Sequence, residues 1–419
     1  MQNRPKILFI TSHWPLAPAY GAQQRVLHIG RLLSHFGELS FLMVPTEQED
    51  EETVRRTELE FDVRKILRPL PVAPDRRLGW RPERIRHEFD PTFLATDPYA
   101  VSESGRAEMQ EMFDQYDLIW VHTVRTANWF RIYRWPHSVL DVDDLPSRSL
   151  LSEAQSGRIP FKRLLDFRRS WIWRRRERFL QDRFDVLTVC SEDDRKYLAN
   201  ANRIYVIPNG ASSLPEHSRV LSETPRIGLI GNCTYAPNEE GIKWFVRDIW
   251  PKIKREFPNA ELRLVGRGSD GHLTSLGPDI AGLGWLQDPG EEIATWSAMI
   301  VPIKVGSGTR VKVAEGFARR CPVVATKLGA FGYEVKNGRE VLLADSAEDF
   351  ASACTQLLRN QEFGKALAQR AYERFLERWR WDSFESTVGK VVHECLAMNQ
   401  RHQEDPAYLA SKHDRDDPL

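Results

Sequence analysis

This sequence of 419 residues has little of several features that define common protein classes. It has five cysteines, which are Cys190, Cys233, Cys321, Cys354 and Cys395. They are odd in number, scattered and without a CxxC pair, so neither a disulfide framework nor a zinc cluster is expected. No apolar run reaches the roughly 18 residues of a membrane span, and Lys6 leads into a short strand rather than into the apolar core of a signal peptide. We therefore expect a cytoplasmic protein with reduced thiols.

An excess of charge of one sign is also missing, because 59 Lys and Arg residues balance 59 Asp and Glu residues. This balance gives no overall attraction to nucleic acid, and no nucleic-acid partner is expected. Residues 159–185 depart from it, since they are predicted to be helical and are dense in Arg and aromatic side chains. The apolar residues that fit one helix side are Phe161, Leu164, Leu165, Trp171, Ile172 and Phe179. Either this stretch associates peripherally with the inner face of an anionic membrane, or its aromatics are core and its arginines are solvated.

The chain is long enough for two domains, and its hydrophobic pattern has two similar halves. Residues 6–13 predict a strand, 23–36 a helix and 39–44 a second strand, which is the opening of a doubly wound parallel sheet. Gly21 opens the helix near the carboxyl end of the first strand, where such sheets bind ligands, although the GxGxxG of a dinucleotide site is missing. We predict an N-terminal domain over residues 1–210.

A polar segment separates this domain from a second one. Residues 211–224 follow a Pro-Asn-Gly turn and are rich in polar residues, as in a linker. The alternation of strands and helices then restarts, so residues 225–380 are predicted to form a second domain of the same Rossmann-like kind. Residues 381–400 are expected to be helical, and 401–419 to be a flexible tail because they are charged and poor in apolar side chains. The long helices expected in the second half span 239–257 and 361–398.

The most informative stretch is 301–326, VPIKVGSGTRVKVAEGFARRCPVVAT. It predicts a strand, a Gly-Ser-Gly turn, a short helix that carries Arg310, Lys312 and Glu315, and a second strand. The glycines let the backbone approach a pyrophosphate, and the two cations add charge at the positive end of the helix. Glu315 lies on the side of Lys312, where a carboxylate can accept hydrogen bonds from sugar hydroxyls. The alternative is a surface helix with a Lys/Glu pair after a flexible turn.

Polar residues follow two predicted strands of the first domain. His122 ends the strand at 116–122, and Asp143 and Asp144 follow the strand at 138–142. Because the carboxyl ends of parallel strands meet at one edge of a sheet, these three side chains should reach the same rim.

Taken in order, these segments resemble the family 4 glycosyltransferases, which are retaining enzymes of the GT-B architecture. The resemblance covers nearly the whole chain. The matching segments are the opening strand with its Gly21 loop, FDVLTVCSEDDRKYL with VIPNGAS, IGLIGNCTYAPNEEGIKWF, and GWLQDPGEEIATW followed by the 301–326 stretch and KLGAFGYE. It implies an α/β protein with two Rossmann-like doubly wound domains facing a cleft. The first domain would bind the acceptor, the second the nucleotide sugar, and the helix at 381–400 would pack back on the first.

The resemblance also implies roles for single residues. Glu315 matches the second glutamate of the family's E-x7-E motif and is expected to bind the ribose hydroxyls. Trp285 and Leu286 lie in the segment expected to contact the base, while His122 and Asp144 are expected on the acceptor side. The expected ligands of the donor diphosphate are Gly21, Gly306, Ser307, Gly308, Thr309, Arg310 and Lys312.

Three places depart from the family pattern. Ser307 stands where the first glutamate of the motif is expected, and the loop GNCTYAPNEEGIK lacks the Arg and Lys that hold the diphosphate in the family. Arg310 and Lys312 are the substitutes that the sequence offers, and with Asp143 they are the expected catalytic residues. Asp143 stands where the family often has a histidine. Its DVDD context resembles the metal-binding DxD motif of GT-A glycosyltransferases, but those enzymes need no second Rossmann half, so no metal or other cofactor is expected.

The implied reaction moves a sugar, of the hexosyl type, from a nucleotide-diphosphate sugar to a hydroxyl of a glycan or lipid-linked acceptor with retention of anomeric configuration. Polysaccharide or glycolipid assembly is the expected setting. Front-face displacement is the preferred mechanism, because no carboxylate pair is evident for a covalent intermediate. The alternatives are a GT-B epimerase or hydrolase of nucleotide sugars and a non-catalytic protein that binds them. The sequence does not specify the base, the sugar, the acceptor or the oligomeric state.

Overall fold

The computed structural model describes residues 4–16, 21–46, 48–71, 99–156, 159–198, 202–212 and 219–404. The chain divides into two compact units, which are described one at a time. Unit 1 comprises Met1–Ser147, Arg168–Ile207 and Phe384–Leu419, and unit 2 comprises Arg148–Phe167 and Pro208–Ser383. This division differs from a single break at residue 210, because residues 148–167 group with unit 2. The predicted tail beyond residue 404 and residues 213–218 of the predicted linker lie outside the described residues.

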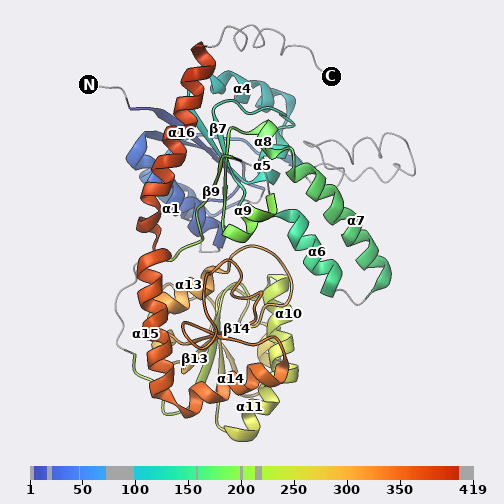
Figure 1. Ribbon diagram of the computed structural model, residues 1–419, viewed down its shortest axis with the longest axis vertical. Helices are drawn as coiled ribbons and strands as arrows, with labels where there is room; N and C mark the ends of the chain where they lie inside the picture. Colours follow the sequence, from blue (N-terminus) through green and yellow to red (C-terminus); the bar gives the residue numbers. More distant parts are fainter. Residues whose placement is uncertain are drawn as a thin grey trace. The chain divides into compact units, whose positions relative to one another are not determined.

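Unit 1 is built on a parallel sheet of seven strands in the order β3-β2-β1-β6-β7-β8-β9 (Figure 1). The strands are β1 (Lys6–Thr11), β2 (Glu38–Met43), β3 (Asp62–Ile66), β6 (Leu118–His122), β7 (Ser138–Asp141), β8 (Val186–Val189) and β9 (Ile204–Val206). The central strands β1, β6, β7 and β8 are apolar and buried, as expected of strands that are covered on both faces. The chain order reverses between β1 and β6, so their carboxyl ends form the switch point at which doubly wound sheets bind ligands.

Helices from both ends of the sequence pack on this sheet. They are α1 (Gly21–Phe36), α2 (Glu51–Glu60), α4 (Glu103–Phe113), α5 (Val124–Trp129), α8 (Leu180–Arg183), α9 (Glu192–Leu198) and α16 (Glu385–Glu404). The last of these runs beside α1 (Figure 1), and a Cβ added to Gly389 would lie 2.8 Å from the Phe36 ring. A short antiparallel pair, β4 (Leu70–Pro71) with β5 (Tyr99–Ala100), is separate from the main sheet.

Unit 2 has a parallel sheet of six strands in the order β12-β11-β10-β13-β14-β15. The strands are β10 (Arg226–Ile230), β11 (Glu261–Val265), β12 (Ile280–Gly282), β13 (Ala298–Val301), β14 (Val323–Ala325) and β15 (Leu342–Leu343). Its helices are α10 (Ala236–Trp244), α11 (Trp250–Glu256), α12 (Gly290–Ala294), α13 (Val311–Ala318), α14 (Ala347–Arg359) and α15 (Gln361–Arg378). The chain order again reverses between two central strands, here β10 and β13, so the loops that follow them form the switch point of this sheet.

Two predicted long helices are interrupted. A π-helical turn at Phe245–Ile249 separates α10 from α11, where the proline in the first turn of α11 lacks a backbone N–H. The stretch predicted as one helix over 361–398 is α15 and α16, separated by a 3₁₀ turn at Trp381–Phe384, and α16 passes residue 400, at which the helix was expected to end.

The basic aromatic stretch also forms two helices, α7 (Pro160–Glu177) and α8, after an additional helix α6 (Pro146–Ser156). The six predicted apolar residues do not share one environment. Phe161, Leu164 and Trp171 are 71%, 67% and 58% exposed, whereas Ile172 is 9% exposed. The prediction of a single apolar side is therefore wrong, because three of the six side chains are exposed while Ile172 is buried, and Phe179 lies beyond the end of α7. No helix in the described part of the chain is long and apolar enough to cross a bilayer.

Candidate functional site

The loop between β13 and α13 lies at the carboxyl end of a central strand of unit 2. Its glycines adopt left-handed backbone angles, with φ of 118° at Gly306 and 75° at Gly308. A Cβ at Gly306 would lie 2.7 Å from the Nη2 atom of Arg310, so a side chain here would displace the guanidinium as well as strain the backbone. The Gly306 N–H donates to the Oγ atom of Ser152 at 3.1 Å. The glycines thus let the backbone fold closely around the Arg310 guanidinium.

Several polar atoms of this loop are buried without a hydrogen-bond partner among the described residues. They are the Ser307 Oγ, the Thr309 Oγ1 and the Nε and Nη2 atoms of Arg310. Ser307 and Thr309 are 6% and 7% exposed. An unsatisfied buried polar group costs about 1–3 kcal/mol, so four such atoms in one loop indicate that a ligand with hydrogen-bond acceptors binds there.

Arg310 is the N-cap of α13 rather than a residue inside the helix, which corrects the predicted element boundary. Its Nη1 atom donates to the carbonyl of Ser307, and its own carbonyl accepts from the Tyr333 hydroxyl at 3.2 Å. The guanidinium is therefore held at the start of the helix, where the dipole is also positive.

Lys312 is 9% exposed and extends away from this loop. Its Nζ atom donates to the Oδ1 of Asn238 at 2.8 Å and lies 3.1 Å from the position a Cβ would take at Gly231. Burial, together with the Arg310 charge, lowers the pKa of Lys312 to about 8. Gly231 begins the loop after β10, the loop that lacks the diphosphate-binding cations of the family, so Lys312 brings a cation from α13 to that loop.

Glu315 pairs with Arg319, and not with Lys312 as in the alternative of a surface Lys/Glu pair. Its Oε1 atom lies 3.3 Å from the Arg319 Nε, and the Nη1 of Arg319 lies 3.4 Å from the Oδ1 of Asp288. Burial raises the pKa of Glu315, although the Arg319 charge opposes the shift. Trp285, on the loop between β12 and α12, is 48% exposed. A carboxylate and an exposed aromatic ring therefore lie on neighbouring segments that Arg319 connects.

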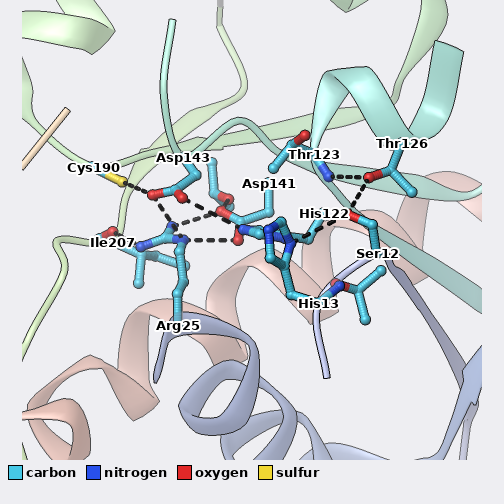
Figure 2. Close-up of polar contacts among 12 residues, drawn as sticks. Ser12, His13, Arg25, His122, Thr123, Thr126, Asp141, Asp143, Cys190 and Ile207 are labelled. Atoms are coloured by element: carbon cyan, nitrogen blue, oxygen red, sulfur yellow. Dashed lines mark hydrogen bonds and ion pairs between the residues drawn. The ribbon is translucent and has the colours of Figure 1, made fainter. Parts of the chain in front are cut away.

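A second polar cluster lies at the carboxyl ends of β1, β6 and β7 in unit 1, and Figure 2 shows its contacts. His122 pairs in register with Thr11 of β1 and with Asp141 of β7. Asp141 accepts two hydrogen bonds from Arg25, at 2.8 Å from Nε and at 2.6 Å from Nη2, and both side chains are fully buried. This ion pair fixes the end of β7 against α1.

The ring of His122 is fully buried, and neither of its nitrogens has a hydrogen-bond partner within the described residues. The Nε2 atom lies 3.6 Å from the Oδ2 of Asp143, and the His13 ring stands edge-on to it with centroids 5.5 Å apart (Figure 2). The Oδ1 of Asp143 accepts from the Cys190 thiol at 3.2 Å. The Nε2 atom of His122, which makes no hydrogen bond within the described residues, therefore faces the Asp143 carboxylate at the carboxyl edge of the sheet.

The charges of this cluster are largely neutralised. Burial and the neighbouring His122 lower the pKa of His13 to about 4, so this imidazole is neutral near pH 7. Asp141 neutralises Arg25, and burial raises the pKa of the Cys190 thiol well above its usual value. The arrangement offers imidazole nitrogens and one partly exposed carboxylate, Asp143, which suit an uncharged hydroxyl better than an anion.

The structure brings most of the predicted site residues together within each unit. Gly306 to Lys312 form one loop and helix start, and His122 lies beside Asp143 as predicted, while Asp144 is exposed. Gly21 is the first residue of α1 in unit 1, and its assignment to the diphosphate stays a prediction. The residues that sequence reasoning missed are His13, Arg25, Asp141, Asn238 and Arg319. Of these, His13 follows the first strand directly, so the rule of the shared rim would have found it.

No group of three or more His, Cys, Asp or Glu side chains in the described ranges is arranged to hold a metal ion.

Sequence similarity to known glycosyltransferases is strongest in the second half of the chain. Residues 224–360 match the family model described as Glycosyl transferases group 1. A phosphatidyl-myo-inositol mannosyltransferase from Mycolicibacterium smegmatis is 28% identical over 149 residues, which are 34% of this chain and 38% of that protein. An uncharacterized 44.6 kDa protein in the cps region of Klebsiella pneumoniae is 19% identical over 89% of this chain and 96% of its own. The chain thus spans about two fifths of the mannosyltransferase that it matches.

Solved structures share the fold over nearly the whole chain. A sucrose-phosphate synthase from Thermosynechococcus elongatus matches with a TM-score of 0.66 and 16% identity, covering 94% of this chain and 100% of that one. HepE of Anabaena, in complex with UDP and glucose, matches with a TM-score of 0.61 and 15% identity, covering 93% of this chain and 99% of that one. The predicted GT-B fold and the resemblance to the group 1 glycosyltransferases are thereby confirmed.

Proposed function

We propose that this chain, in which residues 224–360 form a group 1 glycosyltransferase domain, transfers a sugar from a nucleotide diphosphate to an acceptor hydroxyl. The observation that carries the proposal is the set of buried, unpartnered polar atoms at Ser307, Thr309 and Arg310. A diphosphate supplies acceptor oxygens for these atoms and negative charge for the buried Lys312. The donor is a nucleotide sugar, the acceptor is a glycan or a lipid-linked molecule, and no nucleic-acid partner is proposed.

The donor occupies unit 2, with its diphosphate in the loop between β13 and α13. Glu315 accepts hydrogen bonds from the ribose hydroxyls, and the Trp285–Leu286 segment contacts the base. HepE of Anabaena binds UDP and glucose in a fold of the same kind, which supports a nucleotide-sugar donor without naming its base or its sugar here.

The reaction retains the anomeric configuration through front-face displacement, with the leaving diphosphate taking the proton of the acceptor hydroxyl. The bond from the anomeric carbon to the diphosphate oxygen breaks as the bond to the acceptor oxygen forms. Arg310 and Lys312 stabilise the charge that develops on the leaving diphosphate. Because Arg310 lies in the loop between β13 and α13 and Lys312 reaches the loop after β10, two cations are available for the diphosphate, and no metal or other cofactor is part of the proposal.

The acceptor hydroxyl is bound in unit 1 by Asp143 and His122, with the exposed Asp144 on the same side of the sheet edge. The unpartnered nitrogens of His122 and the carboxylate of Asp143 hold and orient a hydroxyl. Their setting favours a sugar or polyol hydroxyl over an anionic group.

The exposed face of α7 is proposed as a peripheral membrane surface. Phe161, Leu164 and Trp171 are more than half exposed and recur at helical spacing, with exposed Lys162 and Arg168 beside them. Apolar side chains flanked by cations fit an anionic bilayer. We infer a cytoplasmic protein that meets a lipid-linked or polysaccharide acceptor at the inner membrane face. Two relatives fit this setting: one is named a phosphatidyl-myo-inositol mannosyltransferase, and the other is a protein of a cps region.

Binding and product analysis test the proposal together. Nucleotide sugars of UDP, GDP and ADP are screened by thermal shift, since a bound donor raises the melting temperature with its affinity. The best donor is then incubated with and without a panel of lipid-linked and glycan acceptors. Transfer of the sugar to an acceptor with retention of the anomeric configuration supports the proposal. Product from the donor alone indicates an epimerase or hydrolase, and binding without turnover indicates a non-catalytic protein.

The absence of a metal is tested with EDTA. Unchanged turnover in EDTA supports it, whereas loss of turnover that Mg²⁺ or Mn²⁺ restores contradicts it.

A further inference from the structure

Arg319 lies between the two segments that the donor's nucleoside would contact. It is the C-cap of α13, and its side chain is 7% exposed although its two carboxylate neighbours are more open. Its Nε atom faces the Glu315 carboxylate at 3.3 Å, and its Nη1 atom faces the Asp288 carboxylate at 3.4 Å. One guanidinium thus contacts α13 on one side and the loop between β12 and α12 on the other.

The loop end that Arg319 contacts is ordered by its own hydrogen bonds. The Oδ1 of Asp288 also accepts from the Gly290 N–H at 2.8 Å, at the first residue of α12. Trp285 lies three residues before Asp288 and is 48% exposed, and Gly284 turns the chain with φ of 65°. A contact at Asp288 therefore restricts the segment that carries the exposed ring.

We propose that Arg319 is a positioning residue that joins Glu315 and the 284–288 loop into one surface for the nucleoside of the donor. The inference rests on the proposed function, because it takes Glu315 as the ribose ligand. Arg319 itself touches neither the ribose nor the phosphate. It holds the carboxylate in one orientation and keeps the loop next to it, so that the base and the ribose are bound together.

Electrostatics around Glu315 support this role. The charged groups that face it are Arg319, Asp288 and Lys312. Burial raises the pKa of Glu315, and Arg319 is the largest of the influences that lower it. The ionised carboxylate is the better acceptor for two ribose hydroxyls, so nucleotide affinity should fall as the pH drops through the pKa of Glu315. Without Arg319 this fall should begin at a higher pH.

The test compares ligands that contain different parts of the donor. The full-length protein and the variants Arg319→Gln, Arg319→Lys and Arg320→Gln are titrated by calorimetry with UDP, GDP and ADP, with their 2′,3′-dideoxy analogues, and with inorganic pyrophosphate. Arg320 is a matched control, since it is the next residue and stacks over Tyr372 at 4.1 Å. Arg319→Lys keeps the charge but cannot contact both carboxylates, and it serves where Arg319→Gln folds poorly.

Arg319→Gln should weaken the preferred nucleoside diphosphate about tenfold and move the acid limb of its affinity to higher pH. The same variant should leave pyrophosphate affinity unchanged and should weaken the dideoxy analogue less than the parent nucleotide, because the analogue keeps the base but lacks the ribose hydroxyls. Arg320→Gln should change affinity less than twofold. Wild-type affinity in Arg319→Gln, or an equal loss for pyrophosphate, refutes the role of Arg319 alone. Failure of the wild-type protein to bind any of the three nucleoside diphosphates refutes the proposed function as well.

Discussion

Replacing Lys312 by Met should stabilise the ligand-free protein and abolish its stabilisation by a nucleoside diphosphate. Lys312 is 9% exposed, and burial together with Arg310 lowers its pKa from 10.5 to about 8. At pH 7 the amine is therefore still protonated, and the folded chain contains a buried cation that donates to Asn238. A methionine fills nearly the same volume without the charge.

The magnitude follows from the shift in pKa. A change from 10.5 to about 8 corresponds to about 3 kcal/mol of destabilisation at pH 7, because one pKa unit is about 1.4 kcal/mol. The folded pKa is the lower one, so between these two values the unfolded state binds more protons and the free energy of unfolding rises with pH. Loss of the amine leaves the Oδ1 of Asn238 without its donor, which costs about 1–3 kcal/mol. The net gain expected for Lys312→Met is therefore about 0 to 2 kcal/mol.

Urea unfolding at pH 7, 8, 9 and 10 measures this balance, and thermal shift with UDP, GDP and ADP measures the loss of binding. The wild-type free energy of unfolding should rise between pH 8 and 10 relative to that of Lys312→Met. Lys243→Met is the matched control: Lys243 is 51% exposed in a surface pair with Glu239, so its removal should change stability by less than about 1 kcal/mol. A ligand-free Lys312→Met protein that is less stable than wild type by more than about 2 kcal/mol, or one that keeps the nucleotide shift, would refute the reasoning.

Three further predictions concern the remaining groups. Arg310→Ala should lower kcat/KM for the donor by about 10²- to 10³-fold with an unchanged circular dichroism spectrum, whereas near wild-type turnover would contradict its role. Asp143→Asn should lower kcat at least about tenfold and leave the thermal shift by the donor nucleotide intact, which separates the acceptor side from the donor side. The double variant Leu164→Ser, Trp171→Ser should lose cosedimentation with vesicles that contain anionic lipid while its turnover of a water-soluble acceptor persists, and equal cosedimentation would exclude α7 as the membrane surface.

The repeated strand and helix pattern predicted the fold because the strands of a parallel sheet can be recognised from short stretches of sequence. Buried strands such as 118–122 and 298–301 are short apolar runs, and their carboxyl ends mark the ligand edge. The glycine turn between β13 and α13 was predictable for the same reason, since its glycines and the cations after it lie within a few residues of each other. Helix boundaries were less accurate: the interruption at 245–249 depends on a proline and on packing that no periodicity shows.

Contacts between distant residues could not be predicted. Arg25 and Asp141 are 116 residues apart, and Lys312 reaches Asn238 across 74 residues. Which face of α7 is exposed could not be predicted either. Trp171 and Ile172 are adjacent in sequence, but Trp171 is 58% exposed and Ile172 is 9% exposed. Sequence pattern gave the kinds of side chain at the site, and only the tertiary structure decides which of them meet.

The placement of charge on α13 supports the proposed diphosphate site, although the loop after β10 lacks the Arg and Lys of the family that the sequence resembles. Lys312, Glu315 and Arg319 recur on one helix, which is anchored by the buried Val313 and Phe317. A rigid helix presents the three groups with fixed spacing, so one element replaces cations that the loop after β10 lacks. The same burial that orients Lys312 also lowers its pKa, and the helix is therefore less favourable without an anion than with one. Binding of the donor should thus raise the pKa of Lys312 and stabilise unit 2 in the same step, which couples recognition of the diphosphate to the stability of the domain that holds it.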